Sequence, residues 1–308
     1  IGVSALIIYL MVTNRISIKW PDKSAFHFNK IKEILNYGFY VILTSAGGRS
    51  VRNLDILMLG ALAGLTETGI YSIGFFIGIV IDMPKRALEQ ISIPIVAKAL
   101  NNKNKSKVDE LYKKTSINNL IIGGFIFILI WSNLDNIFEI MPKGDIYSRS
   151  KYVILFIAAA RLINMLGSLN GQIIMHSEHY RYNLYIAISL LILTIITNLT
   201  FIPIYGLTGA AIATFISILT INFLRFLLLY NKEGLQPFSI KTLFSLLLVI
   251  GLTFFIPLVP NIENPFIDIF IKLIIITTLY APIVYMLKLS DDINNLILQS
   301  MKRIGIKL

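Results

Sequence analysis

Long apolar runs are the feature that most constrains the fold of this chain. The run from Leu120 to Trp131 shows no alternation of apolar and polar residues, and comparable runs recur along the sequence. A run near 20 residues can cross a bilayer as a helix, whereas the strands of a membrane barrel would alternate in character. Hydrophobic residues make up 56% of the 308 residues, more than in a typical soluble domain. The sequence therefore predicts an all-α polytopic membrane protein.

About eight full transmembrane helices are expected from the spacing of these runs. They cover residues 34–63, 71–97, 117–131, 152–175, 184–201, 209–229, 243–259 and 266–287. Residues 1–13 read as the end of a preceding transmembrane helix, because the chain starts inside an apolar run without a methionine or a charged leader. We therefore interpret the chain as a fragment that lacks its N-terminal part.

Lysine and arginine predict the orientation of these helices. The connections on one side, counted together with residues 14–32 and 288–308, carry 18 lysines and arginines. The connections on the other side carry 3. The positive-inside rule makes the first side cytoplasmic. Residues 14–33 then form a basic cytoplasmic linker, and the C-terminus is also cytoplasmic. Residues 289–308 are expected to form an interfacial cytoplasmic helix, because Ser290 and two aspartates mark a helix start before an apolar stripe.

Charged residues interrupt the apolar hairpin formed by residues 46–94. One helix carries Arg49, Arg52 and Asp55, and the other carries Asp82, Lys85, Arg86 and Glu89. Their spacing places each set on one helical face. A charge near the bilayer centre costs roughly 2.5–3.5 kcal/mol even on lenient insertion scales. These ions are therefore expected to face one another or a water-filled pathway.

A third polar face lies on the span 152–175, where Arg161 is followed by Asn164, Ser168 and Gln172. Cations outnumber acids across the three faces, and such an excess in a hydrated cavity suits an anionic substrate such as phosphate on a lipid carrier. The predicted substrate-binding residues are Arg49, Arg52, Lys85, Arg86 and Arg161. The supporting acids, or coupling-ion candidates, are Asp55, Asp82 and Glu89. Arg225, near a cytoplasmic helix end, is expected to snorkel to the interface.

A purely structural interpretation of the hairpin ions is also open. Asp82 can pair with Arg86, and Lys85 with Glu89, one helical turn apart. Buried pairs rarely repay their desolvation, however, and an apolar core would hold the helices at lower cost. Ions at this depth more often mark a substrate or ion path.

No enzymatic constellation is apparent in the sequence. Cysteine is absent, and the segment His176-Ser-Glu-His179 has neither metalloprotease spacing nor a third ligand nearby. No Walker-type phosphate loop occurs. We therefore expect no catalytic residue, metal or cofactor, and no nucleic-acid partner.

Two motifs, Arg-Asn-Leu-Asp-Ile-Leu-Met-Leu-Gly at residues 52–60 and a glycine–alanine turn at residues 203–214, resemble segments of bacterial polysaccharide flippases of the O-antigen type. Residues 52–60 with 69–71, and an Ile-Pro pair at 93–94, are similar to the hairpin of helices seven and eight in these proteins. Residues 203–214, Pro-Ile-Tyr-Gly-Leu-Thr-Gly-Ala-Ala-Ile-Ala-Thr, resemble the turn between helices eleven and twelve. These flippases belong to the multidrug/oligosaccharidyl-lipid/polysaccharide exporter superfamily, whose members have two six-helix lobes and two accessory helices.

The resemblance implies both an architecture and a function. Residues 34–229 would be the C-terminal six-helix lobe, and 230–288 the two accessory helices of a fourteen-helix flippase. The implied activity is translocation of undecaprenyl-pyrophosphate-linked oligosaccharide, a lipopolysaccharide precursor, across the bacterial inner membrane by alternating access. The bilayer and the missing N-terminal lobe would be its partners, and the cations named above would line the cavity.

Three other functions are considered. A cation-coupled multidrug or metabolite exporter of the same fold would use Asp55, Asp82 or Glu89 to bind its ion. A glycan polymerase or ligase would be expected to carry a long external loop with arginine or histidine, which the segment 132–151 does not provide. A structural scaffold would not need the buried ions.

Overall fold

The computed structural model describes residues 9–11, 13, 28–51 and 53–303. The chain divides into two units, residues 1–43 and 44–308, each of which is considered by itself. More than half of the first unit lies outside the described residues, including most of the predicted helix end at 1–13 and most of the linker at 14–33. Its described part is mainly the start of helix α2 (Phe28–Val51), which continues into the second unit.

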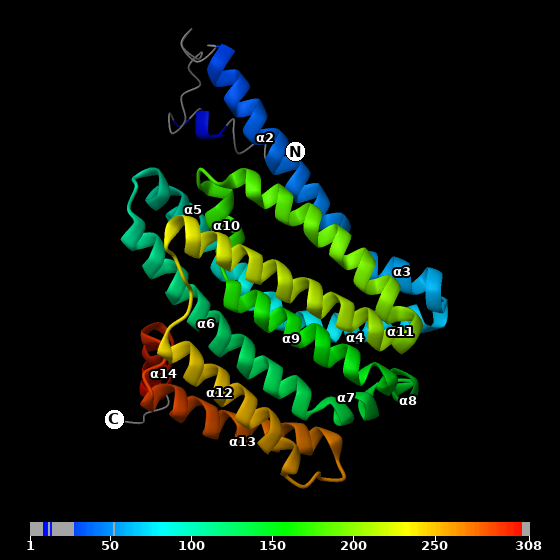
Figure 1. Ribbon diagram of the computed structural model, residues 1–308. Coiled ribbons are helices and arrows are strands. Elements are labelled where there is room, and N and C mark those ends of the chain that lie inside the picture. Colours follow the sequence, from blue (N-terminus) through cyan, green and yellow to red (C-terminus); the bar gives the residue numbers. More distant parts are fainter. Residues whose placement is uncertain (1–8, 12, 14–27, 52, 304–308) are drawn as a thin grey trace. The chain divides into compact units, whose positions relative to one another are not determined.

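The second unit is built from helices alone in its described part, and the prediction of an all-α polytopic membrane protein is confirmed (Figure 1). The elements in chain order are α3 (Leu54–Ala63), α4 (Leu65–Ile79), η2 (Val80–Asp82), α5 (Met83–Asn101), α6 (Lys105–Ser132), α7 (Leu134–Ile140), α8 (Gly144–Tyr147), η3 (Ser148–Ser150), α9 (Lys151–Gly167), α10 (Asn170–His176), α11 (Tyr180–Glu233), α12 (Ile240–Phe255), η4 (Ile256–Leu258), α13 (Pro265–Met286) and α14 (Asp291–Arg303).

Six helical stretches among the described residues are long and apolar enough to cross a membrane. They are Leu65–Asn101, Lys105–Ser132, Gly144–Gly167, Tyr180–Glu233, Ile240–Leu258 and Pro265–Met286. The stretch Tyr180–Glu233 folds back on itself and so supplies two crossings. The predicted first span, 34–63, is divided instead, because α2 ends at Val51 and α3 has only ten residues.

The fold-back inside α11 occurs at Gly206, which adopts φ 56° and ψ −131°. Side chains other than glycine rarely adopt this left-handed region. Gly209 is required for a different reason: a Cβ there would lie 2.0 Å from the carbonyl oxygen of Phe201. The two limbs of α11, residues 180–205 and 207–233, therefore run antiparallel from a turn that lies between the predicted spans 184–201 and 209–229.

The predicted span 152–175 is broken near its middle. Helix α9 ends at Gly167, and Ser168 has φ 40° before α10 begins at Asn170. The hydroxyl of Ser116 on α6 donates to the carbonyl oxygen of Leu166, 2.8 Å away, which satisfies part of the interrupted helix ladder. A hydrogen bond from a helix distant in sequence thus stabilises a helix break that the local sequence does not predict.

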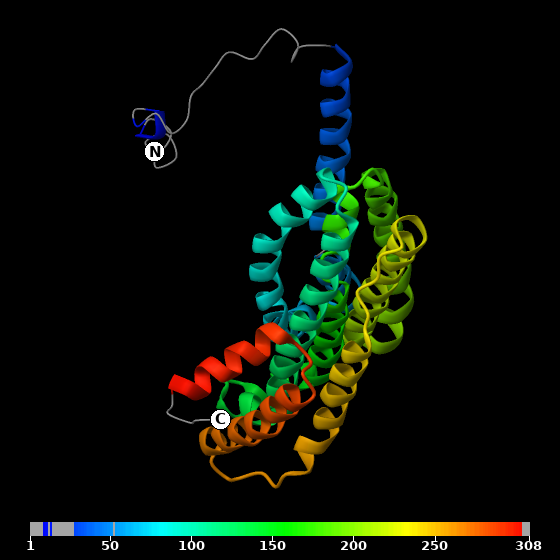
Figure 2. The same ribbon diagram turned by 90° about the vertical axis from the view of Figure 1, so that its left-hand side faces the viewer.

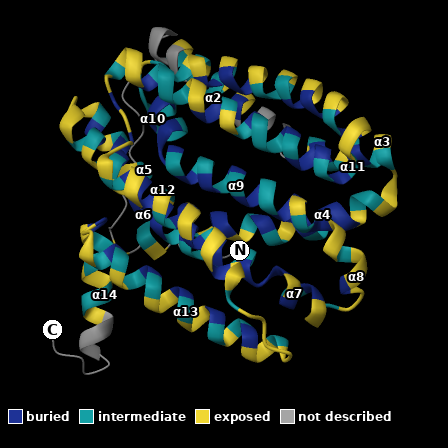
Figure 3. Ribbon diagram, turned by 60° about the horizontal axis from the view of Figure 1, so that its bottom comes forward, coloured by how far each residue is buried: buried dark blue, intermediate teal, exposed yellow. Residues whose placement is uncertain are grey.

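Helices α12 and α13 pack against α6, and α14 follows across the end of α13 (Figure 2). Their shared core with α6 and α9 includes Ile128, Val249 and Ile276. A second core joins α3, α4, α9 and α11 around Leu59 and Tyr71. Buried residues concentrate on α9, whereas α12, α13 and the first limb of α11 carry many exposed residues (Figure 3).

Candidate functional site

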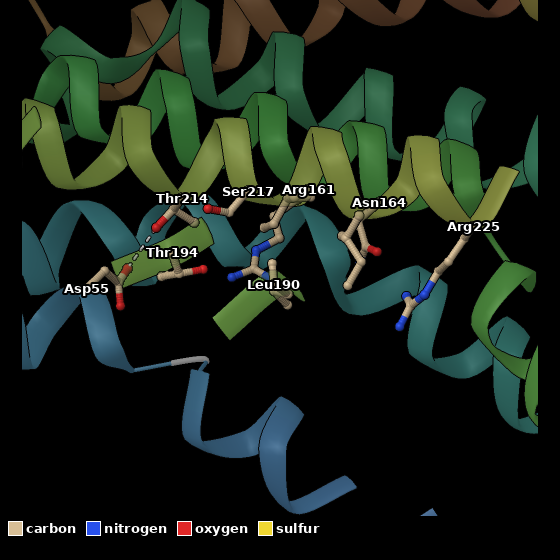
Figure 4. Close-up of a pocket in the computed structure, with 10 residues that line it drawn as sticks. Asp55, Arg161, Asn164, Leu190, Thr194, Thr214, Ser217 and Arg225 are labelled. Carbon is tan, nitrogen blue, oxygen red and sulfur yellow. Dashed lines mark hydrogen bonds between the residues drawn. The ribbon is translucent and has the colours of Figure 1, made fainter. Parts of the chain in front are cut away.

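A polar cavity of about 280 Å³ lies among α3, α9 and the two limbs of α11 (Figure 4). Two arginines and one carboxylate supply its charged lining, and amide and hydroxyl groups supply most of the rest. The lining residues are Asp55, Arg161, Asn164, Leu190, Thr194, Thr214, Ser217, Ile218, Ile221 and Arg225. The cavity thus brings together residues that are up to 170 positions apart in the sequence.

Asp55, in the first turn of α3, is the acid of this cavity and is only 3% exposed. The phenolic oxygen of Tyr71 on α4 donates to its carboxylate, and Thr214 Oγ1 lies 3.2 Å from Oδ2. Its own helix contributes the backbone N–H of Ile56, 2.9 Å from Oδ1. Three donors from three helices therefore hold the carboxylate, which offsets much of the cost of burying it.

Arg161 extends from α9 into the cavity, as Figure 4 shows. Its guanidinium carbon lies 5.6 Å from the centre of the Phe75 ring on α4, a cation–π arrangement that positions the charge. The prediction that Arg161 lies on a polar face is supported by this placement. Asn164, one turn further along α9, lines the same cavity.

Arg225, on the second limb of α11, lines the cavity together with Arg161. Its Nη2 donates to Oδ1 of Asn183 on the first limb, 3.4 Å away. Gly171 on α10 allows the guanidinium to approach the backbone, because a Cβ there would lie 3.2 Å from Nη1. The expectation that Arg225 snorkels to the interface is therefore wrong: packing against α10 directs it inward.

The ions of α5 and the preceding turn form pairs among themselves. Lys85 Nζ lies 3.5 Å from Glu89, and Arg86 Nε lies 3.7 Å from Asp82. The side chain of Lys85 is 9% exposed and that of Arg86 is 60% exposed, so the two cations point differently. These four side chains are not among the residues that line the polar cavity. The pairs match the structural interpretation, and the substrate-binding role of Lys85 and Arg86 stays a prediction.

Two of the predicted cations cannot be placed. Arg49 belongs to α2, but its side chain lies outside what the structure describes, and Arg52 is outside the described residues altogether. Of the eight predicted site residues, the structure brings Asp55 and Arg161 together in one cavity.

The polar face of the second limb of α11 was not predicted from the sequence. Thr214, Ser217 and Arg225 all line the cavity, and their spacing of three and eight residues matches one helical face. Hydroxyl groups in apolar helices are common and give little signal alone. The recurrence of polar residues on the same face as an arginine could have revealed it.

The histidine segment shows an ion-pair geometry. His179 Nε2 lies 3.4 Å from Glu233, which joins the two ends of α11. Burial lowers the pKa of His176, so this imidazole favours its neutral form. The described residues contain no group of three or more side chains that could hold a metal ion.

Comparisons with known proteins agree with this architecture. A family described as "Polysaccharide biosynthesis protein" matches residues 3–134. A probable low-salt glycan biosynthesis flippase, Agl15 of Haloferax volcanii, is 22% identical over 203 residues, which cover 65% of this chain and 41% of that protein. The capsular polysaccharide biosynthesis protein CapF of Staphylococcus aureus is 24% identical over 195 residues, covering 62% of this chain and 49% of that protein.

The chain is similar to polysaccharide biosynthesis proteins, among them a probable flippase. This confirms the resemblance to the exporter superfamily, at low identity. A solved structure, the outward-facing conformation of a multidrug resistance MATE family transporter of the MOP superfamily, matches with a TM-score of 0.56. It is 17% identical, the match covers 72% of this chain and 51% of the transporter, and it supports the fold. The chain spans less than half the length of the two curated proteins that it matches.

Proposed function

We propose that this protein takes part in translocating an anionic lipid-linked oligosaccharide across a membrane. One observation carries the proposal: Arg161 and Arg225 both line a cavity in which Asp55 already receives hydrogen bonds from Tyr71 and Thr214. The net cationic lining suits a phosphate or diphosphate group, because guanidinium donors match phosphate oxygens in charge and geometry. The polysaccharide family match supports a glycan as the remainder of the substrate.

The finer proposal is a flippase that works by alternating access in the bacterial inner membrane, with a cytoplasmic C-terminus. Its substrate is undecaprenyl-pyrophosphate-linked oligosaccharide of the O-antigen type. A second six-helix lobe, opposite this one, completes the cavity, and the two lobes expose the cations to each side in turn. Transport without covalent chemistry is the role that this cavity supports.

Neutralising both arginines tests the proposal. We expect Arg161→Gln with Arg225→Gln to abolish glycan display at normal protein levels in a cell that depends on this protein. Losing one charge-assisted hydrogen bond costs about 1.5–3 kcal/mol, or roughly 10- to 150-fold in binding. The matched control is Arg149→Gln, which removes an exposed arginine paired with Glu67. Full glycan display by the double variant would refute the role of the cavity.

A cation-coupled exporter of the same fold is the second candidate. The observation that favours it is the grouping of the Asp55 carboxylate with the hydroxyls of Thr194 and Thr214 on one cavity wall. Oxygen ligands of this kind suit a small hard cation. Under this alternative, Asp55→Asn abolishes drug efflux in a deletion strain while glycan display does not depend on the protein. Loss of glycan display on deletion, with unchanged drug efflux, would favour the flippase.

A further inference from the structure

A second cavity, of about 220 Å³, lies between the two limbs of α11. It is uncharged, and aliphatic side chains dominate its lining. The lining residues are Ile186, Ser189, Leu190 and Leu193 from the first limb, and Ser217, Thr220, Ile221 and Leu224 from the second. Since every one of these residues belongs to α11, this interlimb crevice is a product of the fold-back at Gly206.

Two polar contacts between the limbs bound the interlimb crevice. On the side nearer the turn, the hydroxyl oxygens of Thr197 and Ser217 lie 3.4 Å apart. On the side nearer the limb ends, Arg225 donates to Asn183. The limbs are thus joined on both sides of a stretch where their side chains leave space unfilled.

The interlimb crevice adjoins the polar cavity. Leu190, Ser217 and Ile221 line both spaces. Figure 4 shows Leu190 and Ser217 near Arg161 among the residues that line the polar cavity. The shared residues therefore border two guanidinium groups in the polar cavity and an apolar slot in the crevice.

The outward faces of the two limbs are apolar as well. Ile188 and Ile192 on the first limb are 46% and 53% exposed, and Leu219 and Phe223 on the second are 44% and 55% exposed. Leu224, which lines the crevice itself, is 37% exposed. The crevice therefore reaches the surface at an apolar residue, between limbs whose outward faces suit hydrocarbon.

We propose that the interlimb crevice holds the proximal part of the hydrocarbon chain of a lipid-linked phosphate or diphosphate, while the head group lies at Arg161 and Arg225. This inference rests on the proposed function and deepens it by assigning a place to the lipid. Lipid already surrounds the chain, so docking gains no hydrophobic free energy from the bilayer. The crevice instead lets the head group enter the polar cavity without drawing methylene groups into water, which would oppose binding.

Photo-cross-linking of the unsubstituted full-length protein tests where the chain lies. The probe is geranylgeranyl diphosphate with a diazirine on the isoprene unit next to the diphosphate, added to protein in lipid nanodiscs. We expect labelling within residues 186–193 and 217–224, and its loss when excess inorganic pyrophosphate competes for the arginines. Labelling confined to α12 and α13, or labelling that pyrophosphate does not reduce, would overturn the inference.

A matched pair of variants tests the consequence for binding. Leu193→Trp fills the interlimb crevice, whereas Ile192→Trp adds the same ring to its exposed neighbour. We expect Leu193→Trp to weaken geranylgeranyl diphosphate binding by about tenfold, the equivalent of roughly two buried methylene groups. Inorganic pyrophosphate should bind all three proteins equally, because it does not use the crevice.

The two ligands separate the possible failures. If inorganic pyrophosphate does not bind the unsubstituted protein, the proposed function and this inference both fail. If pyrophosphate binds but Leu193→Trp leaves geranylgeranyl diphosphate binding unchanged, the crevice assignment alone is overturned. Cross-linking on the unsubstituted protein decides the case in which a tryptophan variant does not fold.

Discussion

The helices around the polar cavity, α3, α9 and α11 (the cavity side), and the helices α7 and α13 (the accessory side) both bury ions, but the surroundings of these ions differ. On the accessory side, Lys272 of α13 lies 2.7 Å from Asp268 and also donates to Asn261, 2.7 Å away. Asn136 of α7 donates to the same carboxylate. Both ions are less than 5% exposed and each has several partners, so this cluster fastens α13 and its preceding loop to α7.

On the cavity side, the cations instead lie along a cavity. Arg161 and Arg225 come from different helices and line a cavity of about 280 Å³. Buried charges that pair with one another join helices. Charges that line a cavity are in a position to bind a ligand. The structure therefore distinguishes ions that join helices from ions that line a cavity, a difference that the sequence does not show.

The largest effect is expected from disrupting the buried cluster of Lys272, Asp268 and Asn136. Lys272→Met leaves Asp268 as a buried carboxylate without its cation, which should cost about 3–5 kcal/mol of unfolding free energy. Thermal unfolding in detergent measures the loss, and Lys272→Met with Asp268→Leu should recover most of it. Arg161→Met on the cavity side should lower stability far less. Equal destabilisation by the two single variants would erase the distinction between the two sides.

A smaller effect is expected from the hydrogen bond that fixes the cavity acid. Tyr71→Phe removes one donor from the buried Asp55 carboxylate, which should cost about 1.5–3 kcal/mol because the acceptor is charged. The same thermal unfolding assay applies, with Tyr152→Phe as control because that residue is 59% exposed. Unchanged stability would show that Asp55 does not depend on Tyr71.

The smallest effect concerns the attachment of α14. Burial disfavours the charged form of Asp292, but hydrogen bonds from Lys114 and Asn118, both 2.8 Å long, outweigh it and lower its pKa. A carboxylate with a depressed pKa stabilises the folded state above the ordinary value, and the contribution is lost as pH falls through its folded pKa. The pair is partly exposed, so less than about 1 kcal/mol is expected.

Hydrogen exchange of α14 amides as pH is lowered below about 4 measures this contribution, since an unperturbed aspartate titrates near there. We expect α14 to lose protection before the cores of α12 and α13. Asp292→Asn should remove the pH dependence. A pH profile that is identical in this variant would assign the loosening to another group.

Much of the fold follows from the apolar runs, but breaks in the helices do not. The fold-back at Gly206 lies between two predicted spans, 184–201 and 209–229, where the resemblance at residues 203–214 also implied a turn. The break at Ser168 was not predicted, because its stabilising donor, Ser116, lies fifty residues away on α6. Interactions between helices determine where such breaks occur, so the local sequence pattern does not predict them.

The candidate site was predictable to the same extent. Asp55 and Arg161 stood out because a charge in an apolar helix is costly wherever it points. Arg225 has the same chemistry, yet its position near a helix end favoured an interfacial role in the sequence argument. Only its packing against Gly171 and Asn183 turns it toward the cavity.

The sequence by itself determined that this chain crosses a membrane as helices, because a backbone in hydrocarbon must satisfy its own hydrogen bonds and apolar runs of this length leave no other arrangement. It also determined that ions are buried among those helices. The tertiary structure decided which ions pair, as Lys272 does, and which face a cavity, as Arg225 does. The direction in which a charged side chain points depends on how distant segments pack together. It therefore cannot be read from the positions of the charges in the sequence alone.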